Sequence, residues 1–366
     1  MATQTRRTIL LGAGALAVLG GAGAVTHSTA RDAHTQAAED IWISDEQARE
    51  RYPDLALRLV HYATLAANSH NTQPWLFQIA PNRITIRPDL SRRTAVVDPE
   101  DRHLFASLGC AAENMVVAAQ AAGHDTYVET NLEGVIIHFV LGSSSPSPHF
   151  SALLQRQCVR LDYSGAPAST ETLTALQGTA DLLDVDLALF TDDHDKQQLS
   201  DLILAGNTAQ IGDPSFVQEL KDWIRFDGRH AAATRDGLYA GSTGNPTLPR
   251  WLGRKLFDLG FTVDAENAKT ARHVATSAGL AVITAWRDDP VGWIEAGRAC
   301  QRFAHEATVQ GLKYAFLNQP IEVPEIRPSL QSFLASDRRP NLLMRFGTGP
   351  TCPRSLRRPP QAVLAA

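Results

Sequence analysis

The stretch AANSHNTQPWLFQ, residues 66–78, contains a polar loop between two apolar segments. Residues 54–67 place leucine, valine and alanine on one broad face, which predicts an amphipathic helix. Asn68-Ser69-His70-Asn71 interrupts that pattern, and residues 75–79 then predict a strand. A turn and the alternating residues 84–86 predict the second arm of a hairpin. The sequence therefore predicts a helix, a loop and a hairpin in that order.

The loop itself carries side chains that could hold a ligand. Amide and hydroxyl groups held there could bind a molecule that both donates and accepts hydrogen bonds. The same residue types also serve as ordinary turn and helix-capping residues. The candidate binding residues in this loop are Asn68, Ser69, Asn71 and Gln73.

The rest of the chain repeats this order of elements with different spacing. A small-residue helix is predicted over residues 104–124, followed by a strand at residues 135–141. A second such helix is predicted over residues 293–311, before a last strand at residues 342–347. Gly109 and Gly123 in the first helix have the same spacing as Gly297 and Gly311 around the second. This echo, together with the repeated order, favours an internal duplication whose two helices pack against each other.

The pattern divides the chain into four parts, the last of which contains an insertion. Residues 1–30 are predicted to be an export signal and residues 31–50 a polar leader. Residues 51–148 form the first half, which ends in the proline-broken SSSPSP segment. Residues 149–366 form the second half, with a glycine-rich, irregular and lid-like insertion at about residues 227–259.

Composition excludes several classes of protein. Apolar residues make up 44 % and charged residues 20 %, as in soluble globular enzymes, and the net charge is −5. No long run of lysine or arginine offers a nucleic-acid partner an electrostatic basis. No apolar run after residue 26 has the length that a membrane span needs. The four cysteines are widely separated, and neither they nor the 12 histidines suggest a metal site.

The first 30 residues allow two interpretations. TILLGAGALA, residues 8–17, fits the glycine fingerprint of a dinucleotide-binding turn, but no second strand follows to aim an acid at a ribose. The same letters after Arg6-Arg7 resemble a twin-arginine export signal, with a cleavage site at Ser28-Thr29-Ala30. We favour export, with an uncleaved membrane anchor or a Rossmann start as the alternatives.

Two arginine-bearing segments in the second half are further candidates. Arg156 and Arg160 are four residues apart, so on a helix their guanidinium groups could converge on a phosphate. The basic segment at residues 354–359 includes Arg357. Solvent-exposed arginines are the alternative for both segments.

Together these segments resemble the nitroreductase family of FMN-dependent oxidoreductases. Residues 67–75 are similar to that family's P-S-x-x-N-x-Q-P-W loop, with Ala67-Asn68 in place of Pro-Ser. Residues 156–160 are similar to its R-x-S-x-R/K segment, with Cys158 in place of serine. The resemblance covers most of residues 52–364 and is strongest to the Acg-like branch, in which two units are fused. It implies an α+β fold with mostly antiparallel sheets flanked by helices, arranged as an intramolecular pseudo-dimer.

Each half retains only part of the family's site. The first half lacks the arginine segment, and the second half lacks the NTQPW loop. The resemblance therefore implies one composite FMN site per chain. It assigns the phosphate to Arg156, Arg160 and Arg357, and the ribityl chain or ring to Ser69 and Asn71. The full set of expected cofactor-binding residues is Asn68, Ser69, Asn71, Gln73, Arg156, Cys158, Arg160 and Arg357.

The function implied is two-step electron or hydride transfer through FMN to a nitroaromatic, a quinone or a similar acceptor. NAD(P)H or another reductant would supply the electrons, and no catalytic side chain or metal is required. The expected protein is exported and monomeric, with a small-molecule substrate. The alternative is a non-catalytic protein that binds or sequesters flavin, or a closed-pocket relative without a cofactor.

Overall fold

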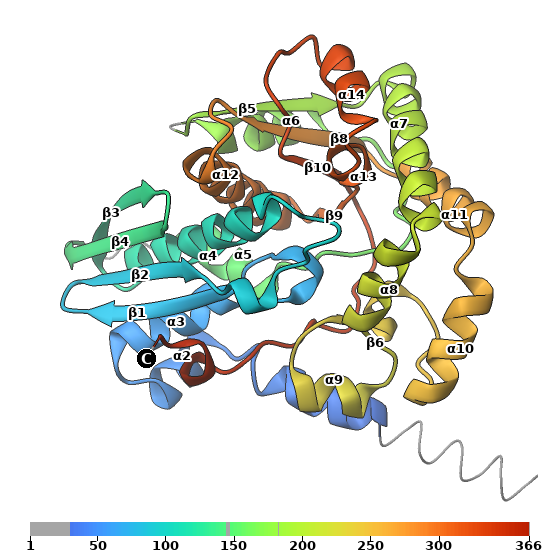
Figure 1. The fold of residues 1–366 in the computed structure, drawn as a ribbon. Helices are drawn as coiled ribbons and strands as arrows, with labels where there is room; N and C mark the ends of the chain where they lie inside the picture. Colours follow the sequence, from blue (N-terminus) through green and yellow to red (C-terminus); the bar gives the residue numbers. More distant parts are fainter. Residues whose placement is uncertain (1–29, 144–146, 182, 366) are drawn as a thin grey trace, which may run out of the picture.

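The computed structural model describes residues 30–143, 147–181 and 183–365. Two four-stranded sheets lie on either side of a pair of long helices, α4 (Arg102–Ala121) and α12 (Pro290–Val309), as Figure 1 shows. Neighbouring strands in both sheets are antiparallel. The predicted α+β class with antiparallel sheets and flanking helices is confirmed.

The two sheets repeat one topology. The first has the order β1-β2-β4-β3 and the second the order β5-β8-β10-β9. In each half, the long helix follows the second strand of the sheet along the chain and precedes the third. The same connectivity in both halves supports the predicted duplication. The strands are β1 (Trp75–Ala80), β2 (Arg83–Pro88), β3 (His124–Asn131), β4 (Gly134–Leu141), β5 (Val185–Phe190), β8 (Gly279–Ala285), β9 (Lys313–Phe316) and β10 (Leu342–Gly347).

The helices α4 and α12 touch through a reciprocal pair of glycines. A Cβ atom on Gly109 would lie 2.0 Å from the carbonyl oxygen of Ile294, and one on Gly297 would lie 1.9 Å from that of Ala106. In each helix, the contacted residue lies three positions before the glycine. Such a reciprocal contact is what two related subunits make across a two-fold axis. The halves therefore pack as a pseudo-dimer.

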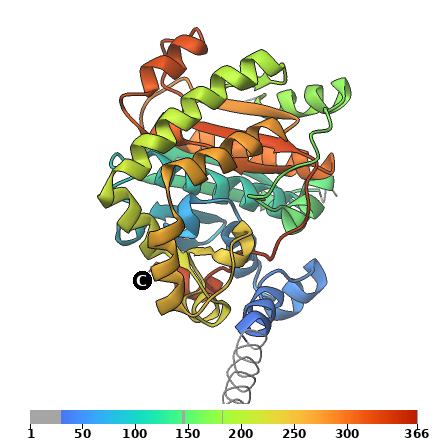
Figure 2. The same cartoon turned by 90° about the vertical axis from the view of Figure 1, so that its right-hand side faces the viewer.

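The second sheet is covered on both faces. All residues of its middle strands, β8 and β10, are buried, as expected where helices pack on both sides. The helix pair covers one face, and an apolar cluster joins the other face to four further helices (Figure 2). Those helices are α7 (Asp193–Gly212), α11 (Val263–Ala275), α13 (Gln319–Glu322) and α14 (Arg327–Phe333).

The largest difference between the halves is the connection that follows the first strand. In the first half, Pro81 and Asn82 form a tight turn between β1 and β2. In the second half, an insertion separates β5 from β8. It comprises α7, α8 (Pro214–Trp223), β6 (Ile224–Arg225), α9 (Gly228–Thr234), β7 (Leu238–Tyr239), η4 (Ala240–Thr243), α10 (Arg250–Gly260) and α11.

Residues 227–259 are therefore not the irregular stretch that the glycines predicted. Asp227 caps α9 by accepting a hydrogen bond from the His230 amide at 2.8 Å. Arg225 pairs with Asp236 at 2.7 Å beside the short parallel β6–β7 pair. These local contacts order the segment, and the insertion extends beyond it on both sides.

Both ends of the described chain pack against the fold. Residues 30–39 are helical, and Ala37, Ala38 and Ile41 join the main core, so part of the predicted polar leader packs against the fold. At the other end, the Ala365 amide donates to the Phe77 carbonyl at 2.8 Å. The tail of the second half thus completes the first sheet. The predicted export signal lies outside the described residues, apart from Ala30.

The remaining elements connect these layers. They are α2 (Asp45–Arg51), α3 (Leu55–Thr64), η1 (Ser69–Asn71), η2 (Leu90–Arg92), α5 (Pro148–Gln155), α6 (Thr170–Gln177), η3 (Gly178–Ala180) and η5 (Pro360–Val363). Within the described ranges, one helix, α4, is long and apolar enough to cross a membrane, but 83 % of its apolar window is buried in the protein. We therefore interpret it as a core helix.

Candidate functional site

A cavity of about 540 Å³ lies at the seam between the two halves. Its floor contains Ser107 and Cys110 of α4, Cys300 of α12 and residues 315–317 at the end of β9. Helices α7, α8, α10 and α11 of the insertion contribute its roof. Cavities of this size and mixed lining typically hold small molecules or cofactors.

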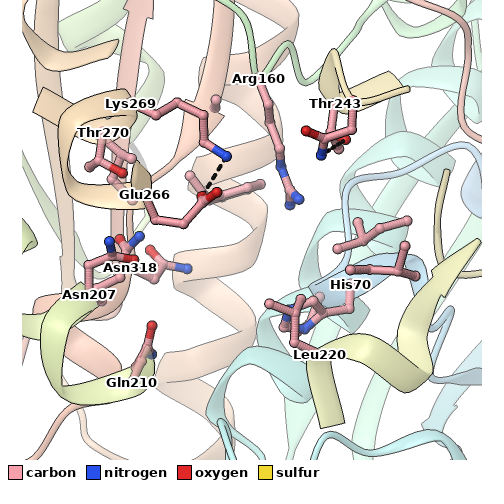
Figure 3. Close-up of a pocket in the computed structure, with 18 of the residues that line it drawn as sticks. His70, Arg160, Asn207, Gln210, Leu220, Thr243, Glu266, Lys269, Thr270 and Asn318 are labelled. Carbon is pink, nitrogen blue, oxygen red and sulfur yellow. Dashed lines mark hydrogen bonds and ion pairs between the residues drawn. The ribbon is translucent and has the colours of Figure 1, made fainter. Parts of the chain in front are cut away.

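Polar side chains gather at two ends of the cavity (Figure 3). His70 of the loop and Thr243 of η4 lie at one end, and Arg160 points into the space between the ends. At the other end, Glu266 and Lys269 of α11 form an ion pair of 2.5 Å. The other polar residues at that end are Asn207, Gln210, Thr270 and Asn318.

The loop of residues 68–73 has a strained backbone. His70, Asn71 and Gln73 have φ angles of 44°, 55° and 55°, in the left-handed region that side chains other than glycine rarely adopt. Such strain persists only where the surroundings hold it, and it is common at ligand sites. The loop is therefore a built feature of the cavity wall.

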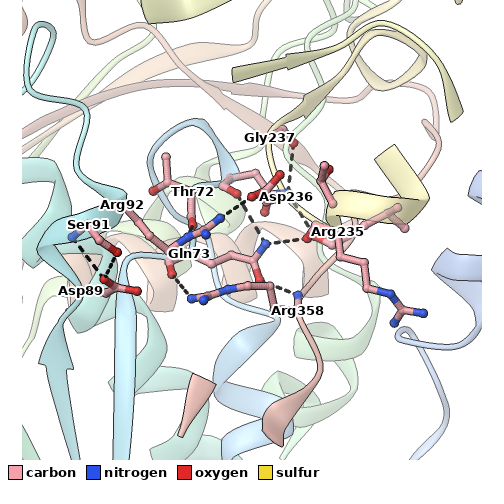
Figure 4. Close-up of polar contacts among 12 residues, drawn as sticks. Thr72, Gln73, Asp89, Ser91, Arg92, Arg235, Asp236, Gly237 and Arg358 are labelled. Carbon is pink, nitrogen blue, oxygen red and sulfur yellow. Dashed lines mark hydrogen bonds and ion pairs between the residues drawn. The ribbon is translucent and has the colours of Figure 1, made fainter. Parts of the chain in front are cut away.

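Two amide side chains that were predicted to bind the cofactor instead help to fix the strained backbone of this loop. Asn71 is buried and donates to the carbonyls of Gly237 (3.1 Å) and Leu356 (3.0 Å). Gln73 is fully buried, donates to the Arg235 carbonyl at 2.8 Å and accepts from the Arg358 amide at 2.7 Å (Figure 4). Neither lines the cavity. They instead tie the loop to the insertion and the C-terminal tail.

Two of the predicted phosphate ligands cap the end of α3. Arg357 is buried and donates to the carbonyls of Thr64 at 2.7 Å and Ala66 at 2.9 Å. Arg156, also buried, donates to the Leu65 carbonyl at 2.8 Å and to the Tyr314 hydroxyl. Arginines at a helix C-terminus satisfy its free carbonyls and its dipole. Burial lowers the pKa of Arg357 to about 9, so its charge is held at a cost in solvation.

Arg160 is the predicted phosphate ligand that reaches the cavity. It is partly exposed, and its guanidinium group has no hydrogen bond or ion pair among the described residues. The buried Arg345 donates to the carbonyls of Val159 (3.2 Å) and Leu161 (2.7 Å), on either side of Arg160. Arg345 thus fixes the backbone that aims Arg160 inward. The guanidinium group is available for an anionic ligand.

Two further predicted residues line the cavity and one does not. Asn68 lines it and closes the loop by accepting from the Gln73 amide at 2.8 Å. Ser69 also lines it, with its amide held by the Ser107 hydroxyl at 3.2 Å. Cys158 instead pairs with Tyr314 in an isolated β-bridge. The structure therefore brings together Asn68, Ser69 and Arg160, and it places Asn71, Gln73, Arg156, Cys158 and Arg357 outside the lining.

Burial disfavours the charged forms of two titratable groups near the loop, His70 and Glu322. Burial lowers the pKa of His70 to about 3, so its imidazole is neutral at pH 7. Glu322 lies 3.5 Å from His103, and burial raises the pKa of its carboxyl group. The guanidinium group of Arg160 therefore provides the positive charge at this part of the cavity wall.

The pseudo-two-fold axis relates this seam to a second one on the other side of the helix pair. There, ion pairs fill the place that corresponds to Cys110. Arg298 follows Gly297 as Cys110 follows Gly109. Its guanidinium group lies 3.2 Å from Glu113 on α4, and Arg302 lies 2.8 Å from the same carboxylate. A thiol on one seam and charged side chains on the other make the two seams unequal.

Sequence reasoning missed the roof residues. The side chains of Asn207, Gln210, Glu266 and Lys269 lie on helices of the insertion, in segments without a recognisable motif. Their place in the cavity lining depends on long-range packing, which no local pattern encodes. Among the residues that the structure describes, no group of three or more histidine, cysteine or acidic side chains could hold a metal ion.

Several of the known proteins to which this chain is similar are named as nitroreductases. No protein-family model matches the chain. Two curated relatives, which carry the provisional name NAD(P)H nitroreductase, come from Mycobacterium tuberculosis strains CDC 1551 / Oshkosh (MT3217) and ATCC 25618 / H37Rv (Rv3131). Each is 23 % identical over 304 residues, which cover 79 % of this chain and 83 % of the relative.

Solved nitroreductase structures show a weaker similarity to this chain. A nitroreductase with bound FMN from Desulfitobacterium hafniense is 11 % identical, with a TM-score of 0.36 over 57 % of this chain and 92 % of its own. The FMN-dependent nitroreductase NfnB from Mycobacterium smegmatis, in complex with NADPH, is 12 % identical, with a TM-score of 0.35 over 55 % and 87 %. The sequence similarity to the two mycobacterial relatives supports the nitroreductase family for this chain.

Proposed function

We propose that the protein is an FMN-dependent oxidoreductase with two fused nitroreductase units, as in the Acg-like branch, and one flavin site per chain. The observation that carries this proposal is the seam cavity, with the strained loop on one side and the unpaired Arg160 guanidinium at its wall. The mycobacterial relatives support the same family and a nicotinamide electron donor.

The residues that line the cavity fit the three parts of FMN, namely its phosphate, its ribityl chain and its ring. Arg160 supplies an inward-facing positive charge for the phosphate. Asn68 and Ser69 supply amide and hydroxyl groups for the ribityl chain. The side chains of Ala106, Ala315 and Leu317 supply apolar surface for a flat ring.

When bound, FMN supplies the two-electron chemistry. The chain's own residues position and shield it. The loop tied by Asn71 and Gln73 holds Ser69 at a fixed place, and the aromatic side chains of Phe216, Phe226 and Phe257 exclude water from the roof. The acceptor would be a nitroaromatic, a quinone or a similar small molecule, and nucleic acid plays no part.

A second candidate function is favoured by the roof. Four helices of the insertion cover the cavity, as expected of a protein that retains flavin without turning it over. The two functions differ in whether an outside acceptor reaches the reduced flavin.

The test is a pair of anaerobic half-reactions on the full chain loaded with FMN. NADPH is added first, and bleaching of the flavin absorbance is followed; menadione or a nitroaromatic is then added, and recovery of the absorbance is measured. Bleaching and recovery in every cycle support the oxidoreductase. Flavin that dithionite reduces but that neither NADPH nor an acceptor affects supports sequestration instead.

We also propose that the chain is exported and works as a monomer. Export rests on Arg6-Arg7 and the apolar residues that follow them, and the monomer on the internal pseudo-dimer. Replacing both arginines with lysine should retain the protein in the cytoplasm, as measured by cell fractionation. Unchanged fractionation would refute a twin-arginine route.

A further inference from the structure

Helix α10 has two apolar faces, of which one is used inside the protein. Its inner face packs Gly253 against Phe226 and stacks Phe257 on Phe261 at 4.5 Å between ring centroids. Its outer face carries Trp251 and Leu259, whose residues are 65 % and 77 % exposed. Because these two positions are eight residues apart, they lie about 80° from each other around the helix axis, on one broad face. Core packing therefore does not explain the outer face.

The outer face also carries positive charge. Lys255 lies between Trp251 and Leu259 on the same side, and Arg250 begins the helix; both are exposed. Neither forms an ion pair among the described residues, whereas Arg254 pairs with Asp222 at 3.2 Å and Asp258 pairs with Lys221. The charges on this face that no ion pair among the described residues balances, those of Arg250 and Lys255, are therefore both positive.

Helix α10 lies at the same end of the molecule as the start of the described chain (Figures 1 and 2). Gly228 of α9 packs so closely on Ala30 that a Cβ atom would lie 2.0 Å from the Ala30 carbonyl oxygen. Figures 1 and 2 both show α9, α10 and residues 30–39 at the lower end of the molecule. Another 29 residues precede Ala30, and they include an apolar run at residues 8–25.

We propose that α10 docks on an anionic lipid surface. Tryptophan and leucine flanked by basic side chains are typical of helices that lie in a membrane interface, where the rings enter the acyl boundary and the cations reach phosphate. The basic residues match anionic headgroups in charge. Leu256, which lines the cavity and is 46 % exposed, places the cavity beside the docked face.

The experiment uses quenching of tryptophan fluorescence by brominated lipid, with the full chain and vesicles of brominated phosphatidylcholine and phosphatidylglycerol. The chain has six tryptophans, so variants identify the source of the signal. Trp251→Phe should abolish most of the quenching. Trp286→Phe is the matched control, because Trp286 is also exposed, at 51 %, but lies directly after β8 on another part of the molecule.

Charge is tested separately. Lys255→Gln should raise the lipid concentration that gives half-maximal quenching of Trp251 by about fivefold. This is the ordinary effect of one basic residue near an anionic surface. Pure phosphatidylcholine vesicles should give several-fold less quenching than the anionic mixture. Equal quenching in both lipids would overturn the anionic preference.

The docking proposal fails if wild-type fluorescence is unaffected by brominated vesicles, or if Trp251→Phe leaves the quenching unchanged. It also fails if sedimentation shows a dimer that Leu259→Ser dissociates, because α10 would then bind a second copy of the chain. Neither result depends on flavin or turnover, so the test is independent of the proposed enzyme activity.

Discussion

The contact between α4 and α12 predicts that alanine at Gly297 or Gly109 destabilises the protein, although alanine is the better helix former. The added Cβ would lie 1.9 Å from the Ala106 oxygen in one variant and 2.0 Å from the Ile294 oxygen in the other. Ordinary contact is about 3.5 Å, so the helices must move apart by about 1.5 Å. Overpacking of this kind costs about 1–3 kcal/mol and sometimes more, whereas Gly→Ala in a helix gains about 1 kcal/mol. Because the clash is with backbone atoms of the partner helix, we expect the upper end of that cost, and therefore a net loss of about 2 kcal/mol in each variant.

The assay is urea unfolding followed by far-UV circular dichroism. Gly212→Ala is the matched control, since Gly212 ends α7 and a Cβ atom added there would meet no neighbouring atom within 4 Å. The control should be neutral or slightly stabilising. Similar free energies of unfolding for Gly297→Ala, Gly109→Ala and the wild type would refute the close helix contact, and with it the pseudo-dimer packing.

Three further predictions concern single side chains. Arg357→Met should lower the free energy of unfolding by about 2–4 kcal/mol, because carbonyls at the end of α3 lose charged hydrogen bonds. The amount of FMN bound per folded chain should not change. A loss of FMN binding without a loss of stability would restore Arg357 as a phosphate ligand. Arg160→Ala should weaken FMN binding by about 1–3 kcal/mol in a fluorescence titration and leave the free energy of unfolding unchanged. An unaltered FMN affinity would refute the phosphate contact of Arg160. Burial lowers the pKa of His61 to about 4, below its unfolded value of 6.5, so the unfolded state binds more protons between these pH values and stability falls as pH falls. Between pH 7 and pH 5, His61→Phe should therefore lose about 1–2 kcal/mol less than the wild type in urea unfolding, and equal losses would contradict the assignment.

The sequence predicted the parts of the fold that have strong local patterns. The helices that became α4 and α12 carry long runs of small apolar residues, and their equally spaced glycines anticipated the contact between them. The alternation around residues 75–86 anticipated β1 and β2. In these segments, the local pattern and the tertiary contacts agree.

In the two four-stranded sheets, the strands missed were β3 and β9, which are the same element of the repeat. Each lies at an edge of its sheet. The residues of β3 alternate between half-buried and exposed, and β9 is four residues long, so neither forms an apolar run. Edge strands depend on pairing with their neighbour more than on their own hydrophobicity.

The candidate site was predicted at the level of its segments and less well at the level of its side chains. The loop and the arginine segment do meet at the seam, but only Asn68, Ser69 and Arg160 face the cavity. A motif records which residue types are required and does not distinguish a ligand contact from a contact that holds the backbone. Arg357 and Asn71 are of the second kind, because their donors are used by buried carbonyls.

The central claim is that one seam of the pseudo-dimer forms a flavin site and the other does not. The most direct test is the stoichiometry of FMN binding, measured by titrating the purified full chain with FMN and quantifying the flavin released after heat denaturation. The account predicts one FMN per chain, with weaker binding in Arg160→Ala. Protein that takes up no FMN, or two per chain, would contradict it.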